Sequence, residues 1–75
     1  MSAVHINRPS STRFQAMIKG RGCRKWIHCG KPLQHRGAAA RVMLRAFLHN
    51  DIKRGCVAMT AEYYDPMIVM EITRP

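Results

Sequence analysis

The chain has 75 residues, of which 47 % are hydrophobic, and thirteen Lys and Arg against four Asp and Glu give a formal net charge of +9. A chain of this length forms one small domain that buries only about 60 % of its unfolded surface, which excludes a two-domain enzyme. Its apolar content is too high for a disordered basic tail, so we expect a folded domain, alone or as a homodimer.

No apolar run reaches the roughly 20 residues that a membrane-spanning helix needs. The longest run, residues 38–48, is interrupted by Arg41 and Arg45. The N-terminus contains Arg8 and Pro9 and lacks the apolar core of a secretory signal peptide. We therefore predict a cytoplasmic location in the host cell and no membrane partner.

The charge is distributed unevenly along the chain. Residues 1–50 contain ten Lys and Arg and no carboxylate, a charge of +10, whereas residues 51–75 contain three cations and four carboxylates, a charge of −1. Unopposed cations attract nucleic acid, acidic protein faces or anionic lipid. A basic protein that is merely soluble is the alternative interpretation.

Residues 1–11 show no sustained alternation of apolar and polar side chains, so we predict a loose N-terminal arm followed by a single domain over residues 12–75. Residues 12–19 do alternate, with Phe14 and Ile18 on the apolar face. This pattern predicts a half-buried first strand.

A glycine-containing connection follows the first strand. Residues 20–24 include two glycines and predict a hairpin loop. Residues 25–29 form the returning strand, which Gly30 and Pro32 end because proline cannot donate a hydrogen bond to a neighbouring strand.

Residues 34–50 change to a period of 3.6 and predict the single helix. Its start has no capping side chain, and His35 with Arg36 places positive charge at the positive end of the helix dipole. Asn50 is expected to end the helix in a left-handed conformation. The predicted apolar face consists of Ala40, Met43, Leu44, Phe47 and Leu48. The opposite face consists of Ala38, Arg41, Arg45 and His49.

The remaining residues predict a second hairpin. Residues 53–55 connect the helix to a third strand that begins at Cys56, residues 64–66 predict a turn, and residues 67–73 predict a fourth strand. The order strand, strand, helix, strand, strand predicts an α+β fold, an antiparallel sheet of about four strands with one helix on one face. The opposite face and the free edges are then open to a partner or a second copy.

The aromatic residues have different expected environments. Trp26 belongs either to the core or to an interface, and the sequence leaves both open. Tyr63 and Tyr64 lie on opposite faces of their strand, so we expect one buried and one exposed tyrosine.

Three cysteines are present, and no metal or other cofactor is expected. Cys23, His28, Cys29 and His35 form the set that most resembles a zinc site, but five residues separate the two cysteines where two to four are usual. Cys29 and Cys56 are expected to be small buried side chains, and Cys23 an exposed, reactive thiol.

The sequence carries no catalytic motif, so we predict that the protein is not an enzyme. All four carboxylates follow residue 50, and no phosphate-binding glycine loop or nucleophile elbow is present. A small basic ribonuclease built from His28, His35 and Tyr63 is an alternative, because phosphodiester cleavage needs only a base, an acid and cations.

The basic residues are the stronger lead. The first hairpin and the loop before the helix each carry three of them, and the two clusters can converge at one end of the domain, where free helix N–H groups favour an anion. Arg41 and Arg45 extend the positive charge along the helix. A solvated basic rim is the alternative. The predicted binding residues are Arg21, Arg24, Lys25, Trp26, Lys31, His35, Arg36, Arg41 and Arg45.

Residues 12–73 resemble the small anti-CRISPR proteins that phages encode. The resemblance lies in a short basic hairpin, a helix that opens with Gly37-Ala38-Ala39-Ala40 and a closing hairpin. Many of those proteins are acidic DNA mimics, and the charge of +9 excludes mimicry here. The resemblance instead implies a cationic inhibitor that occupies an acidic face of a host complex or engages nucleic acid. The first half also resembles the three-stranded DNA-binding sheets of phage integrase arms.

We therefore expect a small basic binding protein of a phage or another mobile element. It would inhibit or modulate a host nucleic-acid-processing complex, with an acidic face of a host protein or nucleoprotein complex as its partner. The alternative is a direct DNA- or RNA-binding module that contacts phosphates with the same basic residues. A membrane-surface protein is disfavoured because Arg41 and Arg45 are too few for a strong lipid-binding helix.

Overall fold

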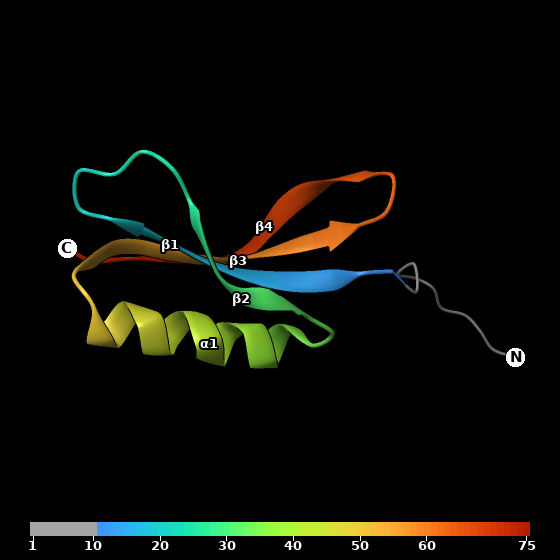
Figure 1. The fold of residues 1–75 in the computed structure, drawn as a ribbon, viewed down its shortest axis with the longest axis horizontal. Helices are drawn as coiled ribbons and strands as arrows, with labels where there is room; N and C mark the ends of the chain where they lie inside the picture. The colour runs from blue at the N-terminus through green and yellow to red at the C-terminus, as the bar shows by residue number, and fades with distance from the viewer. Residues whose placement is uncertain (1–10) are drawn as a thin grey trace, which may run out of the picture.

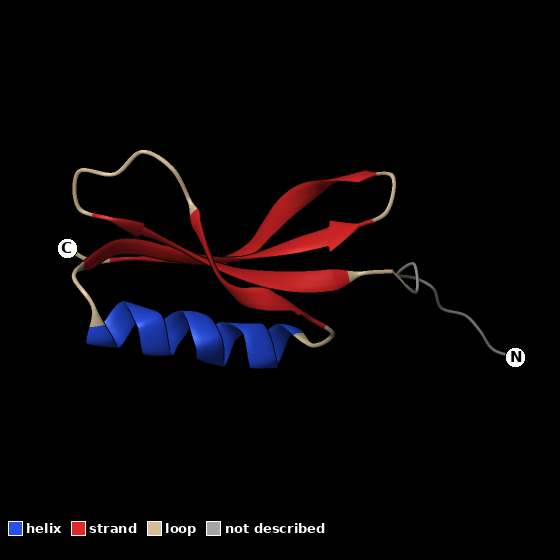
Figure 2. Cartoon of the chain, viewed as in Figure 1, coloured by secondary structure: helices blue, strands red, loops and turns tan. Residues whose placement is uncertain are grey.

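The computed structural model describes residues 11–75, so the predicted arm lies outside the described residues except for Ser11. The four strands form one antiparallel sheet in the order β2-β1-β3-β4, and the helix covers one of its faces (Figures 1 and 2). The predicted α+β fold and element order are confirmed. The elements are β1 (Arg13–Gly20), β2 (Ile27–Leu33), α1 (Arg36–His49), β3 (Ile52–Ala61) and β4 (Tyr64–Thr73).

The core lies between α1 and the strands β1, β2 and β3. Met43 and Phe47 of the helix are buried, as predicted. Leu44 and Leu48 are 40 % and 70 % exposed, so their predicted place on the apolar face is wrong. Each follows a buried residue by one position and therefore points about 100° away from it around the helix. The sheet buries only a narrow stripe of α1.

Strand β3 begins at Ile52, four residues before its predicted start at Cys56. Gly55 is a buried strand residue rather than part of a connecting loop. A Cβ atom at this position would lie 2.5 Å from the Met43 Sδ and 3.3 Å from the Phe47 Cδ1. A glycine is required here because α1 approaches the strand closely, and not because the chain turns at this position.

Strand β2 continues through Gly30 and Pro32, so the prediction that it ends at residue 29 is wrong. β2 is an edge strand, where a proline without an N–H group is tolerated. Its register with β1 shifts, and Gly30 has a φ of 69°, which together indicate a β-bulge. The buried Gln15 holds this bulge, because its Nε2 donates a hydrogen bond of 3.2 Å to the Gly30 carbonyl.

The second hairpin turns at Glu62 and Tyr63, before the predicted turn at residues 64–66. Tyr63 has a φ of 70°, which is uncommon outside glycine. Tyr63 and Tyr64 are 93 % and 68 % exposed, so the expectation of one buried tyrosine is wrong. Strand β4 accepts Pro66 because it is the second edge strand of the sheet.

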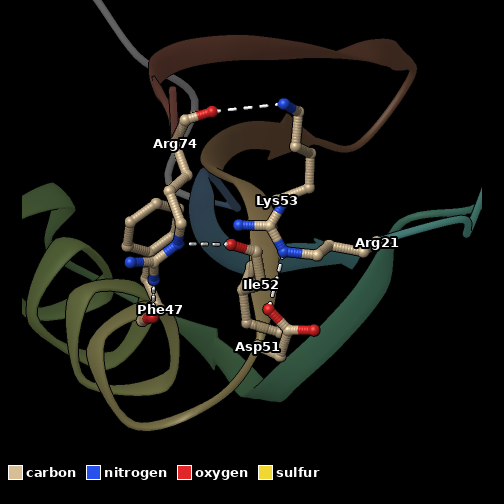
Figure 3. Close-up of polar contacts among 6 residues, drawn as sticks. All are labelled: Arg21, Phe47, Asp51, Ile52, Lys53 and Arg74. Carbon is tan, nitrogen blue, oxygen red and sulfur yellow. Dashed lines mark hydrogen bonds and ion pairs between the residues drawn. The ribbon is translucent and has the colours of Figure 1, made fainter.

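Two side chains from beyond the last turn of α1 donate hydrogen bonds to carbonyl groups at its C-terminal end. Asn50 is extended, with a φ of −138°, rather than left-handed as predicted, and its Nδ2 donates to the Ala46 carbonyl at 2.9 Å. The Arg74 Nη2 donates to the Phe47 carbonyl at 2.7 Å (Figure 3). At the other end, His35 precedes the helix without a side-chain cap, as predicted.

Within residues 11–75, no helix has the length and apolar character needed to cross a bilayer.

Candidate cationic interface

The two predicted basic clusters lie at opposite ends of α1. Arg21, in the β1–β2 loop, reaches Asp51, two residues beyond the C-terminal end of the helix, and its Nε lies 2.7 Å from the Asp51 Oδ1 (Figure 3). His35 and Arg36 stand at the N-terminal end, which the fourteen-residue helix places about 21 Å away (Figure 1). The two clusters therefore do not converge, because β2 lies between the β1–β2 loop and the start of α1. Lys31, predicted in the loop before the helix, belongs to β2 itself.

Several basic side chains are occupied within the fold. Arg21 is paired with Asp51, and the Lys53 Nζ donates to the Arg74 carbonyl at 3.2 Å. The Arg74 guanidinium lies 4.4 Å from the Phe47 ring centroid and donates to two backbone carbonyls. These contacts connect the β1–β2 loop and the C-terminal residues to the end of α1, although Arg21 and Asp51 remain exposed.

Trp26 lies outside the hydrophobic core. It is half-buried, with the Lys19 Nζ 4.5 Å and the Arg54 Cζ 5.5 Å from its ring centroid. Arg54 also forms an ion pair with Glu71. Lys19 and Arg54 are register partners next to Gly55, so they belong to the sheet face opposite α1. The indole is engaged by cations of its own chain.

Six Lys and Arg side chains make no hydrogen bond, ion pair or ring contact with any residue of the described chain, and all six belong to the predicted binding set. Two lie in the β1–β2 loop, one in β2 and three on α1. Each of these residues is exposed. They are Arg24, Lys25, Lys31, Arg36, Arg41 and Arg45.

The outer face of α1 combines free cations with exposed apolar side chains. Arg41 and Arg45 are exposed one turn apart, and Leu44 and Leu48 are exposed beside them. The helix contains no acidic residue. We call Arg41, Leu44, Arg45 and Leu48 the outer helix face. The sequence pattern located its arginines but placed its leucines in the core.

An open groove of about 650 Å³ runs between α1 and the edge strand β2. Arg41, Arg45 and His49 line it at successive turns of the helix. Its apolar lining comes from Cys29, Leu33, Ala38, Val42 and Ala46. No carboxylate lines the groove, which we call the α1–β2 groove. Sequence reasoning placed His49 on the face of Arg41 and Arg45 but did not count it as a binding residue.

A smaller hollow of about 320 Å³ lies on the sheet face opposite α1. Gln15, His28 and Pro66 are among its lining residues, which come from all four strands. The Gln15 Nε2 is committed to backbone carbonyls, including that of Ala16 at 2.8 Å. None of the six free basic residues lines this hollow.

Cys23 and Cys56 have the exposures that were predicted, whereas Cys29 is less buried than expected. Cys23 is exposed, Cys29 is half-buried and Cys56 is buried. Burial raises the pKa of the Cys29 thiol, and burial with the charge of Glu71 raises the pKa of Cys56 to about 11. Over the described part of the chain, no three His, Cys, Asp or Glu side chains come close enough together to hold a metal ion.

No protein-family model, curated protein or solved structure matches the chain. The candidate interface is therefore defined by the charge, exposure and contacts of its own residues.

Proposed function

We propose that the protein is a small non-enzymatic binding protein that docks on an acidic protein surface through the outer helix face. The observation that carries this proposal is the pairing of free Arg41 and Arg45 with the exposed Leu44 and Leu48 on one helix. Following the resemblance to anti-CRISPR proteins, the proposed target is a host nucleic-acid-processing complex of a phage-infected cell, which the protein inhibits or modulates.

The exposed leucines favour a protein partner over nucleic acid. Leu48 is 70 % exposed, and burying such apolar area against a protein contributes affinity that salt does not screen. The adjacent arginines supply attraction and orientation toward an acidic surface. A phosphate backbone would use the arginines but would leave the leucines in water.

Direct binding to DNA or RNA is the second candidate function. Arg24 and Lys25 are exposed and unpaired among residues 11–75, in a loop that contains no carboxylate. Such a loop can contact phosphates. Trp26, which adjoins the loop, is held beside Lys19 and Arg54, and this disfavours its use as a base-stacking platform.

Two charge-reversal variants test the proposed function. The helix variant carries Arg41→Glu and Arg45→Glu, and the loop variant carries Arg24→Glu and Lys25→Glu. Each variant replaces two charges of +1 by −1, so the formal net charge falls from +9 to +5 in both. The wild type and both variants are used to capture proteins from a nuclease-treated host lysate at about 0.15 M salt, near physiological ionic strength.

We expect the wild type and the loop variant to retain the same acidic protein, and the helix variant to lose it. Circular dichroism and thermal unfolding establish that both variants are folded. Equal loss of capture in the two variants would show that only net charge matters and would contradict the proposal. Loss of the wild-type capture after nuclease treatment would favour the second candidate function.

A further inference from the structure

We infer that the α1–β2 groove binds a short, extended, acidic segment of the protein partner. This inference rests on the proposed function and names the part of the partner that enters the molecule. The groove differs from the outer helix face in that it is hollowed and has an apolar lining, although Arg41 and Arg45 border both.

The apolar lining is shared by α1 and β2. Val42 and Ala46 of α1 and Leu33 of β2 are half-buried, so they present apolar surface that a ligand can cover. A volume of about 650 Å³ lies in the range of natural ligand sites, which are commonly apolar with a few placed polar groups.

The arginines and the histidine that line the groove fit the spacing of an extended chain. Arg41, Arg45 and His49 follow one another at intervals of four residues, which corresponds to about 6 Å along the helix axis. Every second side chain of an extended segment points the same way, at intervals of about 6.6 Å. Carboxylates at alternate positions of such a segment therefore match the spacing of Arg41, Arg45 and His49, while the intervening side chains point the opposite way, toward the β2 side of the groove.

The backbone of β2 also favours an extended occupant. β2 is an edge strand, and its outer side has no partner strand among residues 11–75. An extended segment can therefore lie along β2 without displacing another strand, with its side chains directed alternately toward α1 and toward β2.

Charge complementarity selects the occupant. The groove has three basic side chains and no carboxylate in its lining. Residues 1–10 of the chain itself contain Arg8 and no carboxylate, so they do not complement it. A nucleic acid supplies negative charge but no apolar side chains for the lining. An acidic segment with interleaved apolar residues satisfies both requirements.

The test is a selection of peptides from a random, phage-displayed library of twelve-residue sequences against the purified protein. We expect the enriched peptides to place Asp or Glu at alternate positions with apolar residues between them. Their affinities are then measured for the wild type and for two variants that each introduce a phenylalanine. Val42→Phe fills the groove, whereas Met67→Phe changes an exposed residue of β4 outside both the groove and the outer helix face.

Binding should weaken about tenfold or more in the Val42→Phe variant, which corresponds to about 1.4 kcal/mol, and stay at the wild-type level in the Met67→Phe variant. If Val42→Phe fails to fold, Arg41→Gln with Arg45→Gln at the surface should produce the same loss. Failure to enrich acidic peptides, or equal binding by the Val42→Phe and wild-type proteins, would overturn the inference.

The two proposals can fail separately. If the folded Val42→Phe protein captures the lysate partner as well as the wild type does, but the helix variant does not, the outer helix face binds the partner and the groove does not. If acidic peptides bind the groove but the helix variant still captures the partner, the proposed docking face is wrong.

Discussion

Met43 of α1 lies directly against Gly55 of β3, so closely that no side chain fits between the helix and the strand. A Cβ atom at Gly55 would lie 2.5 Å from the Met43 Sδ and 3.1 Å from its Cγ. Met43 is fully buried and has little room to move aside. This contact fixes the distance between the helix and the sheet, and it thereby sets the position of the outer helix face.

The Gly55→Ala variant should therefore be less stable than the wild type, by about 1–3 kcal/mol, because the added methyl group overpacks the core. The matched control is Gly37→Ala, where the new Cβ meets no atom within 4 Å and the helix gains up to about 1 kcal/mol. Urea denaturation measures both variants. A Gly55→Ala protein as stable as the wild type would show that α1 does not approach the sheet this closely.

Arg74 should stabilise the end of α1. Its Nη2 and Nε donate to the Phe47 carbonyl at 2.7 Å and the Ile52 carbonyl at 3.0 Å, and its guanidinium lies over the Phe47 ring. We expect Arg74→Ala to lower the free energy of unfolding by about 1–3 kcal/mol. Arg36→Ala is the control, since it removes a free cation from the positive end of the helix dipole and should be neutral or slightly stabilising. Equal effects in thermal unfolding would contradict this role.

The three thiols should react with a thiol reagent at different rates. Cys23 is exposed in the β1–β2 loop, whereas burial raises the pKa of both Cys29 and Cys56 and lowers their thiolate fraction. In native protein near pH 8 we expect fast labelling of Cys23, slower labelling of Cys29 and protection of Cys56. Mass spectrometry of the labelled peptides gives the order. Labelling of Cys56 as fast as Cys23 would refute its burial.

Cys56 should also make stability depend on alkaline pH. Burial, then the charge of Glu71, raises its pKa from the ordinary value of 9.0 to about 11 in the folded protein, against smaller opposing effects of Arg54 and Lys19. As the pH rises, this thiol thus ionises at a lower pH in the unfolded chain than in the folded protein. The stability that the protonated thiol gives to the folded protein is complete below pH 9 and is lost as the pH rises toward 11. The stability difference between wild type and Cys56→Ala should therefore shift in favour of the variant between pH 9 and 11. A constant difference over that interval would contradict the raised pKa.

The element order was predictable because each segment carries a clear period, but the ends of the strands were not. A proline ends a strand only where its missing N–H group would be needed for pairing. Pro32 lies in the edge strand β2, where that group is not needed, and the sequence does not show that β2 lies at an edge. Gly55 resembles a turn residue in the sequence, yet it serves the packing of Met43, which lies twelve residues earlier. Both features depend on tertiary neighbours that the local pattern does not reveal.

The free cations of the candidate site were predictable from charge alone, whereas their grouping was not. Arg21 looks like a free loop cation until the fold brings it to Asp51, thirty residues away in the sequence. The seven-residue β2 spans about 23 Å and separates the loop before it from the loop after it, so the clusters at its two ends lie apart. Leu44 and Leu48 were assigned to the core because a helix pattern does not specify how wide a stripe the sheet buries.

The most direct test of the central claim, that the cationic helix serves a protein partner, is a titration of labelled duplex DNA and single-stranded RNA with the wild type, the helix variant and the loop variant. The titration is made at low salt and at about 0.15 M salt. The account predicts that binding seen at low salt disappears at 0.15 M and that both variants weaken it equally. Binding that persists at 0.15 M, with a log-log salt slope of about −0.9 for each of several phosphates on duplex DNA and a selective loss in one variant, would contradict it.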